Sequence, residues 1–442
     1  MGTADAQAGG RSFDVQAATT IAREATMKRV LMIAYHFPPL AGSSGIQRTL
    51  RFVQHLPGYG WQPLVVTADP RAYERTSDDL LQEIPEGTVV HRAFALDTSR
   101  HLALHGRHLA WMARPDRWVS WRFDAVRTGL RMIRDYQPDV IWSTYPIATA
   151  HLIAAQLHRR TGVPWLADFR DPMAQPGYPA NPRTRQSFID IESTAVREAR
   201  FSTFTTPGAA REYRRRYPEA AARILVLENG YDEESFPPTA HTAQAPEPLH
   251  PGQLTLLHSG LVYPMERDPT QLLRALQSLK DSGKLPPGQL RLRFRAAVHD
   301  SMLARLAREH QVEDWIECLP AVGYRAAIAE MLRADGLLVL QAACCNEQIP
   351  AKIYEYLRAG RPILALTDAA GDTAATLRAA GVEHLAPLDS AEAIATQLMA
   401  FVTALRQAKA APPSPAVVRQ ASRRERTAEL VRLLEACRDG GA

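Results

Sequence analysis

The chain has 442 residues, of which 46% are hydrophobic and 22% are charged, and its formal net charge is +5. This composition is typical of a globular protein long enough for two or three domains. The net charge is too small to indicate a nucleic-acid-binding protein. No run of about 18 apolar residues is present, so no membrane-spanning helix is expected.

The first 26 residues lack the continuous apolar core of a signal peptide, and we expect them to form a mobile extension. The four cysteines show no metal-ligand spacing. Without an export signal, reduced thiols are expected, so the sequence predicts a cytoplasmic protein.

The first predicted strand, "RVLMIAY" at 29–35, precedes a predicted helix at 46–56. Between them stand Gly42, Ser43, Ser44 and Gly45. In an open α/β sheet such a loop is where ligands bind, because small residues admit a ligand and the helix amides favour an anion. An ordinary strand-to-helix turn is the alternative.

Basic residues then gather between Arg92 and Arg134, where nine arginines face three aspartates. The same stretch holds Trp111, Trp118 and Trp121. This mixture suits a peripheral contact with the inner face of an anionic membrane. A solvated helical face with its tryptophans in the core is the other interpretation, and both stay open.

Further strand-like and helix-like runs alternate along the chain, which predicts parallel sheets covered by helices. The predicted strands are 62–68, 138–146, 163–169, 201–206, 223–230, 254–260, 290–297, 316–321, 336–342 and 362–367. Proline-rich breaks separate the parts. The expected organisation is an extension at 1–26, a first α/β domain at 27–236, a linker at 237–252, a second α/β domain at 253–410, and a linker with a final helix at 411–442.

The most informative segment is "CCNEQIPAKIYEYLRAGRPILAL". Pro350 suits the first turn of a helix and Gly360 its end. Lys352 in that first turn opposes the helix dipole, and a bound anion would reverse the sign of this interaction. Alternatively, Lys352 pairs with a surface carboxylate.

Glu347 and Glu355 in this segment have the E-x7-E spacing of retaining GT-B glycosyltransferases. The segment resembles the bacterial polysaccharide-synthesis branch of their family-4-like group. The resemblance implies two Rossmann-like α/β domains facing across a cleft, with a C-terminal helix that crosses back to the first domain. It also implies that Glu347 contacts the hydroxyls of the donor sugar and that Glu355 contacts the nucleotide ribose.

Other segments extend the resemblance across most of the chain. "YHFPPLAGSSGIQR" resembles the group's glycine loop, although two serines separate Gly42 from Gly45. "HSGLVYPMERDP" matches at Gly260 and Arg267, and "LPAVGYRAAIAEM" resembles the base-binding loop, which includes Tyr324.

The resemblance implies a nucleotide-sugar donor, which is a substrate, so no cofactor is expected. We find no convincing Asp-x-Asp pair for a metal. Arg267 and Lys352 are therefore expected to stabilise the leaving diphosphate without a metal ion. The alternative for Arg267 is a surface pair with Asp268.

The acceptor side is predicted after the strand at 163–169, in the sequence "WLADFRDPM". Asp168 or Asp171 would orient or deprotonate an acceptor hydroxyl, and Arg170 would meet an acceptor phosphate. A buried Asp–Arg network is the alternative. Many proteins of the resembled group carry a histidine at this turn, which this chain lacks, and His36 is a second candidate.

The sequence therefore predicts a glycosyltransferase that moves a sugar to a carbohydrate or lipid-linked hydroxyl acceptor, in surface polysaccharide or glycolipid assembly. Two alternatives remain. One is a sugar-nucleotide 2-epimerase, which shares the architecture. The other is a catalytically degenerate sugar-nucleotide-binding subunit, which the altered glycine loop favours.

Overall fold

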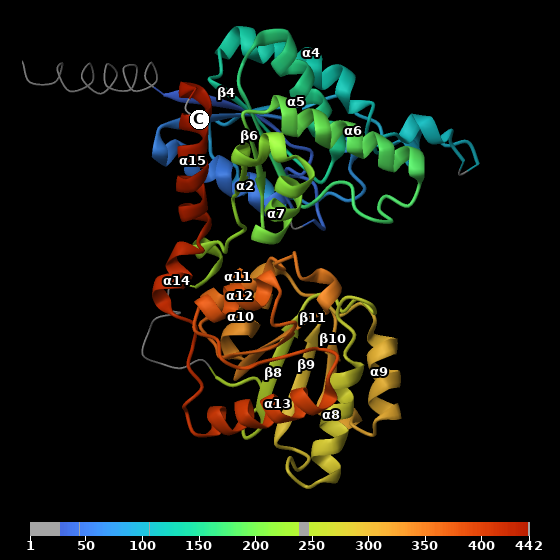
Figure 1. The fold of residues 1–442 in the computed structure, drawn as a ribbon, viewed down its shortest axis with the longest axis vertical. Coiled ribbons are helices and arrows are strands. Elements are labelled where there is room, and N and C mark those ends of the chain that lie inside the picture. Colours follow the sequence, from blue (N-terminus) through green and yellow to red (C-terminus); the bar gives the residue numbers. More distant parts are fainter. Residues whose placement is uncertain (1–26, 44, 106, 238–246, 441–442) are drawn as a thin grey trace, which may run out of the picture. The chain divides into compact units, whose positions relative to one another are not determined.

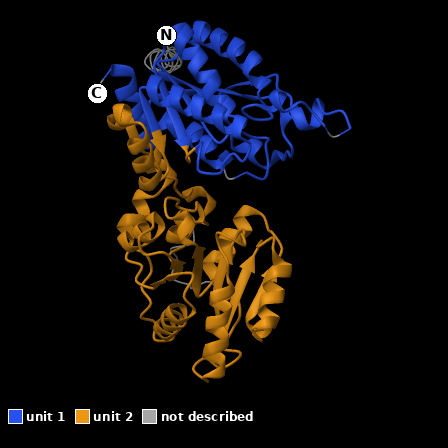
Figure 2. Cartoon of the chain, turned by 45° about the vertical axis from the view of Figure 1, so that its right-hand side comes forward, with its two compact units in different colours: residues 1–169, 173–202, 427–442 blue, residues 170–172, 203–426 orange. Residues whose placement is uncertain are grey.

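The computed structural model describes residues 27–43, 45–105, 107–237 and 247–440. Figure 2 colours its two compact units. Unit 1 consists of residues 1–169, 173–202 and 427–442, and unit 2 of residues 170–172 and 203–426. The expected extension at 1–26 and residues 238–246 of the expected linker lie outside the described residues.

The first sheet has seven strands in the order β3-β2-β1-β4-β5-β6-β7. Its strands are β1 (Lys28–Ile33), β2 (Trp61–Ala68), β3 (Val89–Ala93), β4 (Val140–Thr144), β5 (Trp165–Arg170), β6 (Phe201–Phe204) and β7 (Ile224–Val226). The pairs from β3 to β5 are parallel. The chain order reverses between β1 and β4, which is the position where ligands bind in such sheets.

The second sheet has six strands in the order β10-β9-β8-β11-β12-β13, and every pair is parallel. Its strands are β8 (Leu254–Ser259), β9 (Leu290–Arg295), β10 (Ile316–Leu319), β11 (Gly336–Gln341), β12 (Ile363–Thr367) and β13 (Leu385–Ala386). Here the order reverses between β8 and β11. Both sheets therefore have Rossmann-like topology, as predicted.

Helices connect the strands, as Figure 1 shows. They are α2 (Gly45–His55), α3 (Thr98–His101), α4 (Trp121–Tyr136), α5 (Ala148–Thr161), α6 (Pro182–Glu198), α7 (Pro207–Arg216), α8 (Thr270–Asp281), α9 (Asp300–Glu309), α10 (Tyr324–Arg333), α11 (Lys352–Ala359), α12 (Asp372–Ala379), α13 (Ala391–Arg406), α14 (Pro415–Gln420) and α15 (Arg423–Asp439). None of the described helices is both long and apolar enough to span a membrane.

The strand period of two explains how β11 builds two cores. Leu338 and Leu340 face one core together with Leu276 and Phe401 from the helices of that face. Leu337 and Val339 point the other way, into a core completed by α10, α11 and α12. A strand buried on both faces reads as a continuous apolar run, which is why "GLLVLQ" is recognisable in the sequence.

The final helix returns to unit 1, as the resemblance implied, because residues from Thr427 onward group with that unit. Lys28 Nζ at the start of β1 lies 2.5 Å from Glu435 Oε1 on α15. Leu430, Leu434 and Cys437 of α15 are buried. The predicted domain boundaries stay a prediction, because β7 belongs to the first sheet while its residues group with unit 2.

Candidate functional site

A glycine turn follows β8, next to the point where the order of the second sheet reverses. Gly260 has a φ of +111°, a conformation that favours glycine. A Cβ at this position would lie 3.1 Å from Lys352 Nζ at the start of α11. The glycine therefore serves two needs, the turn itself and the close approach of a lysine to the backbone.

Lys352 is held by a buried histidine. His258 Nδ1 lies 3.0 Å from the Leu338 carbonyl oxygen, so Nδ1 carries the proton and donates. His258 Nε2 is then an acceptor, and Lys352 Nζ donates to it over 3.0 Å. Burial first, and then the neighbouring Lys352 charge, hold the pKa of His258 well below its usual range. The imidazole is therefore a neutral support for the ammonium group.

A second cation stands close to Lys352. Burial and then the charge of Arg267 lower the pKa of Lys352 well below its usual value. The Arg267 guanidinium donates to the Leu261 carbonyl over 2.8 Å and lies 5.2 Å from the Tyr263 ring centroid. The Asp268 carboxylate accepts hydrogen bonds from Thr270 instead. An anion between the two cations would relieve their repulsion.

Glu355 lies on the same helix as Lys352, as predicted, and both residues are in its first turn. Its Oε1 accepts a 2.8 Å hydrogen bond from the Tyr324 hydroxyl at the start of α10. Burial raises the pKa of Glu355 from its ordinary value, although Tyr324, Arg423 and Lys352 act in the opposite direction. The structure thus gathers five predicted residues in one place: Gly260, Arg267, Tyr324, Lys352 and Glu355.

Glu347 precedes α11 and is exposed. Its main-chain carbonyl accepts a 2.7 Å hydrogen bond from Thr206 Oγ1, and Thr206 also caps α7. A Cβ at Gly208 would lie 2.8 Å from Glu347 Cα. Close packing therefore fixes the backbone of Glu347 and leaves its carboxylate at the surface.

The loop after β1 in unit 1 contains the second predicted glycine site. Gly42 has a φ of +78°, and Ser43 Oγ accepts from the Gly45 amide over 3.2 Å, which closes the turn into α2. Ser43 Oγ also lies 3.1 Å from His36 Nδ1. Ser44 lies outside the described residues.

Asp168 at the end of β5 is fully buried. Its two oxygens accept from the guanidinium of Arg48 over 2.8 and 2.9 Å, and Thr144 Oγ1 donates to one of them over 2.9 Å. This geometry favours the buried Asp–Arg network over an acceptor base, with Arg48 of α2 as the partner.

Asp171 is exposed in the turn after β5. Arg170, just before it, has a φ of +62°, and its carbonyl accepts from Thr205. Of the two predicted aspartates, Asp171 is the one that a ligand can reach from solvent.

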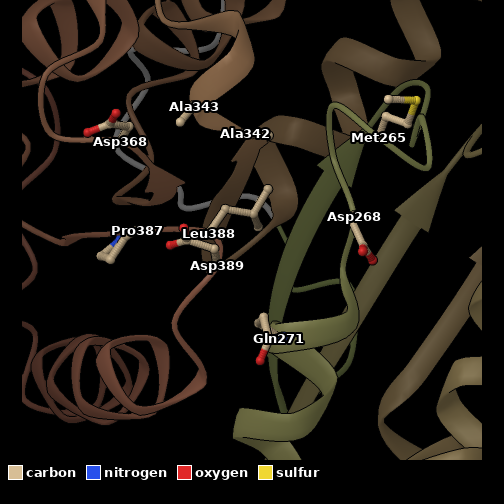
Figure 3. Close-up of a pocket in the computed structure, with 9 residues that line it drawn as sticks. All are labelled: Met265, Asp268, Gln271, Ala342, Ala343, Asp368, Pro387, Leu388 and Asp389. Atoms are coloured by element: carbon tan, nitrogen blue, oxygen red, sulfur yellow. The ribbon is translucent and has the colours of Figure 1, made fainter.

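A pocket of about 410 Å³ lies at the carboxyl edge of the second sheet. Figure 3 shows Asp268 and Gln271 on one side, at the start of α8, and Leu388 and Asp389 on the other. With Asp368 the pocket has three carboxylates. These would repel a phosphate, so the arrangement favours Lys352 and Arg267 as the anion site.

Residues 44–230 match the family described as "Glycosyl transferase 4-like domain". This part of the chain is therefore a glycosyltransferase domain, and the whole chain has the GT-B fold. No curated protein matches its sequence.

Solved structures share the fold of this chain. Sucrose-phosphate synthase from Thermosynechococcus elongatus has a TM-score of 0.60 at 16% identity, over 92% of this chain and 99% of that one. Anabaena Alr3699/HepE, in complex with UDP, has a TM-score of 0.63 at 14% identity, over 93% and 100%. A putative UDP-N-acetylglucosamine 2-epimerase from Listeria monocytogenes has a TM-score of 0.54 at 13% identity, over 93% and 96%. The fold alone therefore does not separate a transferase from an epimerase.

Three features of the candidate site were not predicted from the sequence. His258 ends an apolar strand and resembles a core residue, Thr206 resembles an ordinary helix cap, and Arg48 lies on an amphipathic helix. Each acts through a partner more than 90 residues away. Only the apolar surroundings of His258 and Arg48, in which a polar side chain needs a partner, gave a signal.

Proposed function

We propose that this glycosyltransferase transfers a sugar from a nucleotide-diphosphate donor to a hydroxyl acceptor, with retention of anomeric configuration and without a metal ion. The observation that carries the proposal is the convergence of Lys352 and Arg267 beside the Gly260 turn. The complex of HepE with UDP supports a nucleotide donor in this fold.

The leaving group is a nucleoside diphosphate, which gains negative charge as the glycosidic bond breaks. Lys352 and Arg267 would stabilise that charge, together with the backbone amides at the start of α11. Because the pKa of Lys352 is low in the free protein, a bound diphosphate would favour its protonated form. The cation would then be present when the bond breaks.

The two glutamates would hold the neutral parts of the donor. Glu355 would accept from the ribose hydroxyls, with Tyr324 fixing its carboxylate beside the base. Glu347 would accept from the sugar hydroxyls, since its carboxylate is exposed while its backbone is fixed by Thr206. These roles follow the resemblance of the E-x7-E segment.

On the acceptor side, we propose that Asp171 orients or deprotonates the hydroxyl and that Asp168 supports the end of β5 through Arg48. The hydroxyl would attack the face from which the diphosphate leaves, which retains the anomeric configuration. The acceptor would belong to surface polysaccharide or glycolipid assembly, because the chain resembles the polysaccharide-synthesis branch. A cytoplasmic location would give access to nucleotide sugars.

The test is product analysis with UDP-, GDP- and ADP-sugars in EDTA, with a lipid-linked acceptor extract and with no acceptor. We expect one donor to give a glycoside whose anomeric configuration, read by NMR, equals that of the donor, with no product from Lys352→Met. A 2-epimer formed without acceptor would establish the epimerase instead. Nucleotide binding with no turnover of any donor would favour the degenerate binding subunit.

A further inference from the structure

One segment of unit 1 has a surface that the sugar-transfer site does not use. We call residues 100–105 and 107–114 the basic-apolar segment. Four large apolar side chains in it face solvent: Leu104 is 75% exposed, Trp111 66%, Leu109 61% and Leu102 40%. A soluble protein rarely exposes so many neighbouring apolar side chains unless they contact something.

The charge of this segment has one sign. It contains Arg100, Arg107 and Arg114, and the sequence has no Asp or Glu between Asp97 and Asp116. Arg100 and Arg107 are exposed. A partner surface for this segment must therefore be anionic as well as able to accept apolar side chains.

Hydrogen bonds give the basic-apolar segment a defined shape at its middle and at its base. Leu104 and Arg107 exchange two backbone hydrogen bonds, of 2.8 and 3.0 Å, near its middle. At its base, Thr98 donates through its hydroxyl to the Met112 carbonyl over 3.0 Å and through its amide to the Arg117 carbonyl over 2.8 Å. In both Figure 1 and Figure 2 the segment projects from the body of unit 1. It is a pre-formed projection with apolar side chains and arginines.

Of the three tryptophans in the basic stretch, two fit the interpretation as core residues and one fits the interpretation as a membrane contact. Trp121 is fully buried, and Trp118 is half-buried, with its Nε1 donating to the Ala72 carbonyl over 3.2 Å. Both rings lie against Tyr35, within unit 1. Only Trp111 points outward, and Trp is the residue type that favours the boundary between lipid and water.

We propose that the basic-apolar segment inserts into the head-group region of an anionic lipid surface. Leu104, Leu109 and Trp111 would enter the boundary between head groups and acyl chains, and the arginines would pair with lipid phosphates. This inference deepens the proposed function, because it places a lipid-linked acceptor close to the protein. It does not depend on the donor chemistry, since lipid binding needs no nucleotide.

The experiment is flotation of the intact chain with vesicles of equal parts phosphatidylglycerol and phosphatidylcholine, against vesicles of phosphatidylcholine alone. Two double variants test the two components. Leu104→Ser combined with Trp111→Ser removes apolar side chains, and Arg100→Gln combined with Arg107→Gln removes positive charges. Val298→Ser is the matched control, because Val298 is 68% exposed but lies in unit 2. Thermal melting of each variant checks that unit 1 stays folded.

We expect wild type and Val298→Ser to float with the anionic vesicles only, and less so as salt increases. The Leu104→Ser, Trp111→Ser variant should lose at least about tenfold in partition coefficient. The arginine variant should lose about 25-fold in partition coefficient, from about fivefold for each of its two charges. Absence of vesicle binding, or equal binding by folded variants, would overturn the proposal. So would a dimer in light scattering that both variants dissociate, because the surface would then bind a second copy.

Discussion

Lys352 Nζ donates to His258 Nε2 over 3.0 Å, although 94 residues separate the two along the chain. The imidazole can accept only because its other nitrogen donates to the Leu338 carbonyl. A hydrogen bond to a main-chain atom of β11 thus sets the direction in which the lysine at the start of α11 points. The proposed anion site is therefore positioned by the sheet beneath it.

This relationship predicts the effect of His258→Asn. The shorter amide can still donate to the Leu338 carbonyl but removes the acceptor for Lys352. We expect UDP affinity to fall by about tenfold or more, the cost of one lost hydrogen bond to a charged group. Calorimetry measures this, and a melting curve separates it from unfolding. An unchanged affinity in a folded variant would mean that His258 does not position Lys352.

Gly260→Ala is expected to weaken UDP binding by about tenfold or more, because its Cβ would lie 3.1 Å from Lys352 Nζ. Its positive φ should also cost about 1–3 kcal/mol of stability. Gly283→Ala is the matched control, since Gly283 also has a positive φ, +67°, but has open space around its Cβ. The control should lose stability and keep its UDP affinity. Equal affinity losses in the two variants would point to a general effect of backbone strain.

The raised pKa of Glu355 predicts how stability depends on pH. Because burial raises the pKa in the folded state, the native protein binds more protons than the unfolded chain just above pH 4.5. The contribution of Glu355 to the free energy of unfolding therefore falls as pH rises from the pKa of the unfolded chain to that of the folded protein. Glu355→Gln removes this dependence and keeps an acceptor for Tyr324.

The measurement is Tm against pH for wild type and Glu355→Gln. The variant should gain in Tm relative to wild type as pH rises from 4 to 7. A gain in the opposite direction, largest at pH 4, would show that the carboxylate is stabilised in the folded state by its neighbours.

Asp168→Asn is predicted to cost about 3–5 kcal/mol of stability, because it leaves the buried Arg48 guanidinium without its charge partner. Asp171→Asn should change stability by less than about 0.5 kcal/mol, since Asp171 is exposed. Urea unfolding compares the two. If Asp168→Asn were as stable as wild type but had lost turnover, Asp168 would be a catalytic group after all.

Most of the fold could be predicted because its central strands are buried on both faces. "RVLMIAY" and "GLLVLQA" are continuous apolar runs, and they form β1 and β11. The missed strands are short edges: β3 is only partly buried, and β13 has two residues. An edge strand covered on one side lacks the apolar run that identifies a central strand.

The candidate site could be predicted where its residues share a short segment. Lys352 and Glu355 lie in one helix whose proline and glycine limits are local signals, and Gly360 does end it with a φ of +65°. The supports of these residues come from other strands. His258 and Thr206 meet α11 and its preceding turn only after the chain has folded, so no local pattern connects them.

The most direct measurement is calorimetric binding of UDP, GDP and ADP in EDTA to wild type, Lys352→Met and Glu355→Ala. We expect that wild type binds one of the three nucleotides, that Lys352→Met loses most of the affinity, and that Glu355→Ala binds more weakly. Failure of the folded wild type to bind any of them, or equal binding by Lys352→Met, would contradict the nucleotide site.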